Sequence, residues 1–163
     1  NIFLPETDFP EEHSAATWYY QISENYLCEP VQHYGFYLTP LQNFEKGKTV
    51  FYPHGYSNYF FHPTHPHELI IVSTENNKVS ILNCLSGEIV RTISKGKEYA
   101  FCNIDPVTGN YLFRNSYYVL ITNENGDELF RMRSEDASPY LANNILTCWA
   151  GAAINVEPYL KKP

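Results

Sequence analysis

Between residues 32 and 132 the chain is a succession of short β-type runs that are separated by turn residues. Runs such as ELIIVS (68–73) and YYVLIT (117–122) are rich in β-branched and aromatic side chains, which favour strands. The turns hold Gly, Asn and Asp, which tolerate the positive φ of tight hairpins. Because the runs lie too close together for crossover helices, we expect a mainly β (α+β) fold, an antiparallel meander of about 8–10 short strands.

Each end of the chain carries a pattern that predicts one helix. Pro10 suits the first turn of a helix that Pro30 would end, with an apolar stripe formed by Ala15, Trp18, Ile22 and Tyr26. Near the other end Pro139 suits a first turn, followed by a stripe of Leu141, Ile145, Leu146 and Trp149. The expected organisation is a single domain over 1–163, with an acidic arm and helix at 1–30, an antiparallel β region at 32–132 and a C-terminal helix at 137–150.

A length of 163 residues is typical of one domain with a substantial core. No apolar run approaches the ~18–20 residues that cross a bilayer, and the first residues lack the pattern of a signal peptide. We therefore expect a soluble, cytoplasmic protein. The four cysteines form no C-x-x-C pair, and a domain of this size does not need disulfides, so we favour reduced thiols.

Two consecutive stretches resemble the repeats of WD-type β-propellers. Residues 60–93 and 99–132 share an aromatic entry, an X-Pro turn, a strand, a polar turn, a second strand and a Gly turn, with a period of about 39 residues. Both stretches lack the Trp-Asp pair and the Gly-His start of that family. The resemblance implies a β meander with a protein-binding use. Since a closed propeller needs at least about four blades, we expect an open sheet and not a closed propeller.

The net charge of −7 comes entirely from the first quarter of the chain. Residues 1–45 contain seven acidic residues and no Lys or Arg, whereas eleven acids and eleven bases follow. The negative electrostatic field of these acidic residues repels nucleic acid and anionic membranes, and it accelerates the encounter with a basic protein. Aromatic residues are interleaved with the acids and supply anchors for an interface. The candidate partner-binding residues are Asp8, Glu11, Glu12, Trp18, Tyr19 and Glu24. The alternative is a solvated acidic surface over aromatic core residues.

The segment His62-Pro63-Thr64-His65-Pro66-His67-Glu68 brings three imidazoles and a carboxylate into seven residues. Neutral imidazole is a good ligand for zinc, copper and nickel. The alternative metal site therefore comprises His62, His65 and His67, which His33 or His54 could complete. The competing interpretation is a turn with solvated histidines.

No motif for nucleophilic catalysis or for nucleotide binding is present in the sequence. We therefore predict a non-enzymatic protein with no cofactor, which binds a basic protein partner and neither nucleic acid nor membrane. Its most concrete form is an immunity or inhibitor protein that covers the positive active site of a nuclease-type toxin. The alternatives are a metal-binding protein or metal-dependent enzyme at the histidine cluster, and a propeller-like interaction scaffold.

Overall fold

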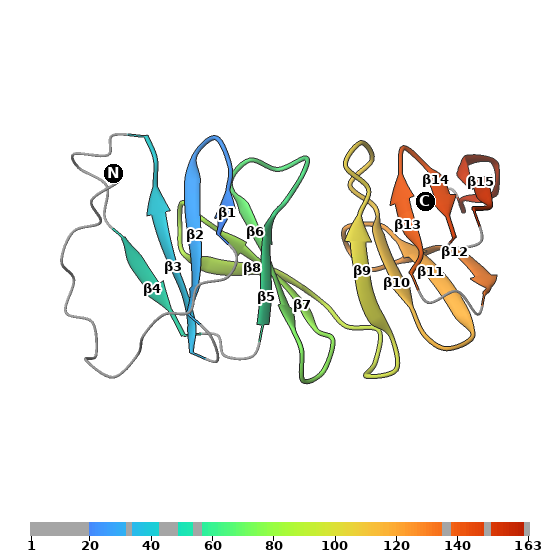
Figure 1. The fold of residues 1–163 in the computed structure, drawn as a ribbon, viewed down its shortest axis with the longest axis horizontal. Coiled ribbons are helices and arrows are strands. Elements are labelled where there is room, and N and C mark those ends of the chain that lie inside the picture. The colour runs from blue at the N-terminus through green and yellow to red at the C-terminus, as the bar shows by residue number, and fades with distance from the viewer. Residues whose placement is uncertain are drawn as a thin grey trace.

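The computed structural model describes residues 20–31, 34–42, 49–53, 57–134, 138–148 and 151–161. These residues form four antiparallel sheets, each a meander of strands in chain order (Figure 1). Sheet 1 contains β1 (Gln21–Ile22), β2 (Tyr26–Val31), β3 (Gly35–Pro40) and β4 (Val50–Tyr52). Sheet 2 contains β5 (Ser57–Phe61), β6 (Glu68–Ser73), β7 (Val79–Asn83) and β8 (Glu88–Ile93).

Sheet 3 contains β9 (Ala100–Ile104), β10 (Tyr111–Arg114), β11 (Tyr118–Thr122) and β12 (Glu128–Arg133). Sheet 4 contains β13 (Tyr140–Ala142), β14 (Ile145–Thr147) and β15 (Ala153–Asn155), and a short 3₁₀ turn, η1 (Glu157–Tyr159), follows it. The expected antiparallel pairing is confirmed in every sheet. Within the described residues no helix is long and apolar enough to span a membrane.

The prediction of an α+β fold with a helix near each terminus is wrong, because the described residues hold no α-helix and are nearly all β. In the segment 137–150, Leu141 and Leu146 lie on paired strands, β13 and β14, opposite each other. The two-residue turn between these strands is Asn143-Asn144, with φ of 50° and 58°. Asparagine tolerates this left-handed conformation, so the pair makes a hairpin where the apolar spacing suggested a helix.

At the other end, Ile22 and Tyr26 of the predicted stripe lie on β1 and β2, on either side of a tight turn. The hydroxyl oxygen of Ser23 accepts a hydrogen bond from the backbone N–H of Tyr26 at 3.0 Å and stabilises that turn. β-branched and aromatic residues suit a sheet better than a helix, and here the sheet prevails. The rest of the predicted arm and helix, residues 1–19, lies outside the described residues.

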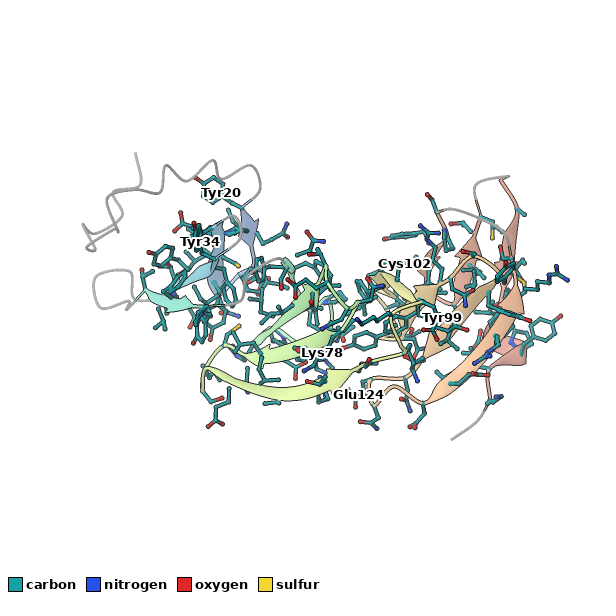
Figure 2. The ribbon with its side chains drawn as sticks, turned by 90° about the horizontal axis from the view of Figure 1, so that it is seen from below. Tyr20, Tyr34, Lys78, Tyr99, Cys102 and Glu124 are labelled. Carbon is teal, nitrogen blue, oxygen red and sulfur yellow. The ribbon has the colours of Figure 1, made fainter. Side chains whose placement is uncertain are left out.

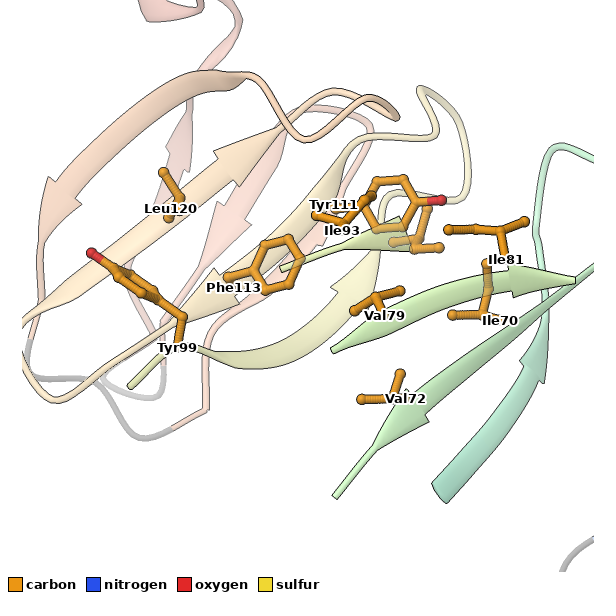
Figure 3. Close-up of a cluster of buried hydrophobic side chains, with 10 residues drawn as sticks. Ile70, Val72, Val79, Ile81, Ile93, Tyr99, Tyr111, Phe113 and Leu120 are labelled. Carbon is orange, nitrogen blue, oxygen red and sulfur yellow. The ribbon is translucent and has the colours of Figure 1, made fainter. Parts of the chain in front are cut away.

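Sheet 2 is buried on both faces, which explains the continuous apolar run of β6. Ile70 and Val72 join a core cluster with sheet 3, whereas Leu69 and Ile71 join a cluster with sheet 1. The alternation follows from the period of two along a strand. Figure 3 shows Ile70 and Val72 on the side of sheet 2 that faces sheet 3. Burying each such side chain contributes roughly 1.5–3 kcal/mol.

In sheet 3, too, side chains alternate between two buried faces. Tyr111, Phe113 and Leu120 face sheet 2. Leu112, Val119 and Ile121 pack instead with Leu141 and Leu146 of sheet 4. The four sheets therefore stand in a row in chain order, with side chains filling the space between neighbours (Figures 1 and 2). Tyr20 and Tyr34 lie at the sheet 1 end of this row, and Tyr99 and Cys102 lie at sheet 3 (Figure 2).

The loops that join the first and second strand of each sheet lie along one edge of the row. They comprise residues 23–25, 62–67, 105–110 and 143–144, and we call them the loop rim. Contacts connect neighbouring sheets at the rim. The hydroxyl of Tyr26, the β2 residue that follows the first loop, lies 3.3 Å from His67 Nδ1, and the Asp105 carboxylate accepts the backbone N–H groups of Asn143 and Asn144, both at 2.8 Å. The rim therefore brings side chains of successive sheets together.

Candidate functional site

The strongest concentration of chemically versatile side chains lies in the second loop of the rim. The backbone N–H of His62 donates to Glu68 O at 2.9 Å, and the N–H of Glu68 donates to His65 O at 3.1 Å. These bonds close the loop and turn His62, His65 and Glu68 toward one another. The ligand atoms of these three residues all lie within 4.8 Å of one another.

The three side chains are unequally buried. His62 is only 4% exposed, whereas the side chains of His65 and Glu68 are 43% and 16% exposed. His62 Nδ1 lies 3.2 Å from His65 Nδ1, which lies 3.5 Å from Glu68 Oε2. The cluster therefore has a buried base at His62 and an opening to solvent at His65.

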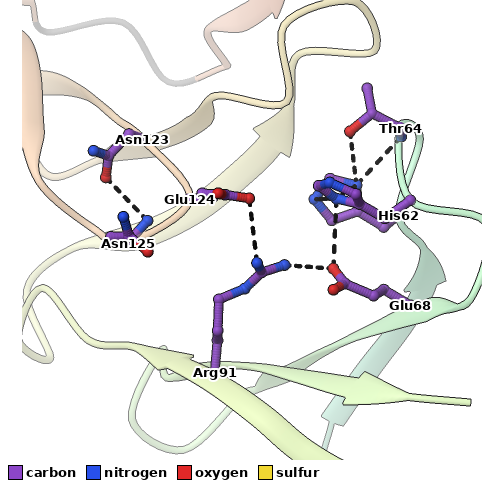
Figure 4. Close-up of polar contacts among 8 residues, drawn as sticks. His62, Thr64, Glu68, Arg91, Asn123, Glu124 and Asn125 are labelled. Atoms are coloured by element: carbon purple, nitrogen blue, oxygen red, sulfur yellow. Dashed lines mark hydrogen bonds and ion pairs between the residues drawn. The ribbon is translucent and has the colours of Figure 1, made fainter. Parts of the chain in front are cut away.

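His62 is held as a neutral imidazole. Burial disfavours its charged form and, together with the charges of His65 and Arg91, lowers the pKa of His62 to about 4. The backbone N–H of Thr64 donates to His62 Nδ1 at 3.3 Å (Figure 4). That nitrogen consequently carries a lone pair rather than a proton.

Arg91 extends from β8 and joins sheets 2 and 3 at this site (Figure 4). Its Nη2 lies 2.5 Å from Glu68 Oε2, and its Nη1 lies 3.2 Å from Glu124 Oε2 in the turn after β11. With a side chain only 25% exposed, Arg91 holds the Glu68 carboxylate in place.

Tyr111 closes the site from the side of sheet 3. Its ring lies 6.0 Å from the ring of His62, centroid to centroid, and the residue is fully buried. Burial raises the pKa of Tyr111 to about 12, with Arg91 lowering it and the nearby carboxylates of Glu68 and Glu124 raising it. Its hydroxyl is one of the few buried side-chain groups among the described residues that have no hydrogen-bond partner.

The structure brings together two of the three histidines in the predicted metal site, His62 and His65. His67 turns to sheet 1, where its ring packs edge-on against Tyr26 at 5.9 Å. Glu68 completes the cluster instead. In an extended segment His65 and His67 would lie on one face. The loop is a compact turn instead, so the two side chains do not share a face.

Arg91, Tyr111 and Glu124 come from distant strands and turns, and no local sequence signal points to them. His33 and His54 lie outside the described residues.

Of the predicted partner-binding residues, only Glu24 is described, and it is exposed in the first loop of the rim. Asp8, Glu11, Glu12, Trp18 and Tyr19 lie outside the described residues. The proposed acidic surface therefore stays a prediction.

No known protein family matches the chain, and no curated protein resembles it in sequence. Solved structures do resemble its fold. BamB from Moraxella catarrhalis matches 79% of this chain at 17% identity and a TM-score of 0.56. The computationally designed Ika4 protein matches 88% of this chain and 92% of its own length, at 10% identity and a TM-score of 0.58. Hsv2 from Kluyveromyces lactis matches 78% of this chain at 10% identity and a TM-score of 0.50.

BamB and Hsv2 are β-propeller-like proteins. The propeller-type resemblance inferred from the sequence is thereby supported at the level of the fold. The chain spans 38% of the length of BamB and 38% of that of Hsv2. The two repeat-like stretches of the sequence, 60–93 and 99–132, coincide with sheets 2 and 3. Each of these four-stranded meanders has the form of a propeller blade.

Proposed function

We propose that this chain is a non-enzymatic protein-binding domain and that one contact with its partner is made along the outer edge of β8. The observation that carries the proposal is that β8 is the last strand of sheet 2 and pairs only with β7. Among the described residues, no other backbone hydrogen bond reaches β8. An edge strand with unpaired N–H and C=O groups is a template for a strand from another chain.

The equivalent edge of sheet 3 is occupied in part. The backbone N–H of Lys161 donates to Leu129 O on β12 at 2.9 Å, and the side chain of Lys161 lies 3.2 Å from a Glu128 oxygen. Arg131 and Arg133 add charge to β12, which discourages strand addition. No comparable backbone contact covers β8 among the described residues, and its Arg91 is engaged by Glu68 and Glu124. β8 exposes Ile89 and Val90 and contains no Pro or Lys.

A basic protein is the partner that the charge favours, because the chain carries a net charge of −7. The most concrete candidate is a nuclease-type toxin, whose phosphate-binding cleft is positive, with this chain as its immunity or inhibitor protein. The resemblance to WD-type repeats supports the broader role of an interaction scaffold.

The edge contact is tested with a matched pair of substitutions. The protein serves as bait in a lysate of its source organism, and the protein recovered in stoichiometric amount is then titrated against each variant. Val90→Lys places a charge on the edge of β8, whereas Val107→Lys makes the same change at a 62% exposed loop position. We expect at least about tenfold weaker binding for V90K and no change for V107K. Equal affinity of both variants would exclude the β8 edge.

The acidic contribution is tested with the triple substitution D8N/E11Q/E12Q. If these acids steer a basic partner, the association rate falls and loses most of its dependence on ionic strength, while the dissociation rate changes little. Stopped-flow measurements at low and high salt separate the two rates. An unchanged association rate would remove Asp8, Glu11 and Glu12 from the interface.

A further inference from the structure

His62, His65 and Glu68 bring three metal-ligating groups together, with their ligand atoms all within 4.8 Å of one another. His62 Nδ1 accepts the Thr64 N–H, and the Glu68 carboxylate is held by Arg91. Both face His65 Nδ1, at 3.2 Å and 3.5 Å. Both contacts are long for hydrogen bonds, and His65 Nδ1 lies between the other two ligand groups.

We propose that His62, His65 and Glu68 together bind one zinc-like divalent metal ion. Zinc bonds of about 2.0–2.1 Å to nitrogen and oxygen place the ligand atoms of a tetrahedral site about 3.4 Å apart. Two of the three separations, 3.2 Å and 3.5 Å, lie on either side of that value, and the third is within 4.8 Å. Two histidines and one glutamate leave the fourth position of the ion open.

The surroundings favour a cation. Glu68 and Glu124 contribute two negative charges against the single positive charge of Arg91, so the site has a net charge of −1 with neutral imidazoles. Arg91 orients the Glu68 carboxylate, as outer residues commonly do for metal ligands. The side chain of His65 is 43% exposed, so an ion can reach the cluster from solvent at this residue.

A second observation points in the same direction. The Tyr111 residue is fully buried, its ring lies beside that of His62, and it is close to the charges of Glu68, Glu124 and Arg91. Its hydroxyl finds no hydrogen-bond partner among the residues that the structure describes. A buried polar group without a partner is costly, and such groups commonly mark a bound ion or water.

The experiment uses the whole chain and the metal ion alone. Metal-free protein is dialysed against Zn²⁺ and analysed for bound metal, and Co²⁺ is then used as a spectroscopic probe, because tetrahedral Co²⁺ absorbs far more strongly in the visible region than octahedral Co²⁺. We expect one equivalent of Zn²⁺ per chain and an intense Co²⁺ spectrum. Substoichiometric Zn²⁺, or a weak octahedral spectrum, would overturn the proposal.

The loop itself supplies a matched control. His65→Ala removes an exposed ligand and should lower Zn²⁺ affinity by about 100-fold or more. His67 lies in the same loop, but its side chain faces sheet 1. His67→Ala should therefore leave the Zn²⁺ affinity and the Co²⁺ spectrum unchanged. Glu68→Gln keeps the shape of the side chain and should weaken Zn²⁺ binding as His65→Ala does. If H65A and H67A bind Zn²⁺ equally, the ion does not occupy this cluster.

Discussion

The second and third loops of the rim occupy the same place in successive sheets but use their first residue differently. His62-Pro63 follows β5, and Asp105-Pro106 follows β9. Both leading residues are buried, His62 at 4% exposure and Asp105 at 0%. They therefore share a position and an environment, and only their hydrogen-bond partners distinguish them.

Asp105 is saturated by the backbone. Its carboxylate accepts the N–H groups of Val107 at 2.9 Å and Thr108 at 3.3 Å within its own loop, and those of Asn143 and Asn144 from sheet 4. His62 accepts one backbone N–H, from Thr64, and meets sheet 3 mainly through the ring of Tyr111. The comparison teaches that the Asp105 carboxylate joins two sheets through backbone hydrogen bonds, whereas His62 is bonded within its own loop and meets the next sheet through a ring contact.

The largest expected effect is the loss of the Asp105 carboxylate. Asp105→Ala leaves buried N–H groups of two loops without an acceptor and should lower the free energy of unfolding by about 3 kcal/mol. Urea denaturation followed by tyrosine and tryptophan fluorescence measures the change. Asp105→Asn, which keeps one acceptor oxygen, should cost less than Asp105→Ala. A loss below about 1 kcal/mol for D105A would contradict a structural role for the carboxylate.

The next effect is the pH dependence of the same contact. Burial alone would raise the pKa of Asp105, but the N–H groups of Asn144, Val107 and Asn143 outweigh it, so the pKa lies below its ordinary value. A lowered pKa in the folded state stabilises the fold above the unfolded pKa of about 4, and this stabilisation disappears as the pH falls through the folded pKa. Urea titrations at pH 7 and pH 3 should therefore show a large difference between wild type and D105N at pH 7 and a smaller one at pH 3. A difference that is independent of pH would contradict this assignment.

The sequence predicted the antiparallel pairing and the strands between residues 32 and 132, because turn chemistry and β-type runs are local signals. It predicted about 8–10 strands, whereas the described residues form 15. It did not predict that the C-terminal segment is a hairpin. The spacing of Leu141, Ile145 and Leu146 fits one face of a helix, and only the positive φ at Asn143 and Asn144 distinguishes the hairpin. The burial of sheet 4 against sheet 3 also depends on contacts that are distant in sequence, such as Leu112 with Leu141.

The candidate site was also predictable only in part, because contacts between residues distant in sequence bring its members together. The density of histidines between residues 62 and 67 marked the right loop, but the choice between His67 and Glu68 depends on how the loop closes. Arg91 and Tyr111 enter the site because sheets 2 and 3 pack face to face, a contact that no spacing in the sequence encodes.

A smaller effect is expected where the two loops of the comparison touch. Gly109 has φ of +75°, and a Cβ at this position would lie 3.2 Å from Thr64 Oγ1 and 3.9 Å from His62 Cε1. Gly109→Ala should lower the free energy of unfolding by about 1–2 kcal/mol from the left-handed backbone, and by more if Thr64 cannot move. Gly151→Ala is the control, because its φ is +77° and nothing lies within 4 Å of the added Cβ. Thermal unfolding of both variants separates the effect of the contact between the two loops from the effect of the backbone conformation. Equal losses of stability in the two variants would show that the added Cβ at position 109 makes no unfavourable contact with the neighbouring loop.

The smallest effect concerns the contact between the first two loops of the rim. Tyr26→Phe removes the hydroxyl that lies 3.3 Å from His67 Nδ1 and should cost about 0.5–1.5 kcal/mol, as one neutral hydrogen bond does. Tyr159→Phe, at a 67% exposed position, is the control and should change little. A double-mutant cycle with His67→Ala, measured by urea denaturation, assigns the loss to this pair of side chains. A loss as large as that of Asp105→Ala would mean that one side-chain pair joins sheets 1 and 2 as strongly as the Asp105 carboxylate joins sheets 3 and 4. The contrast between backbone-bonded and side-chain contacts along the rim would then not hold.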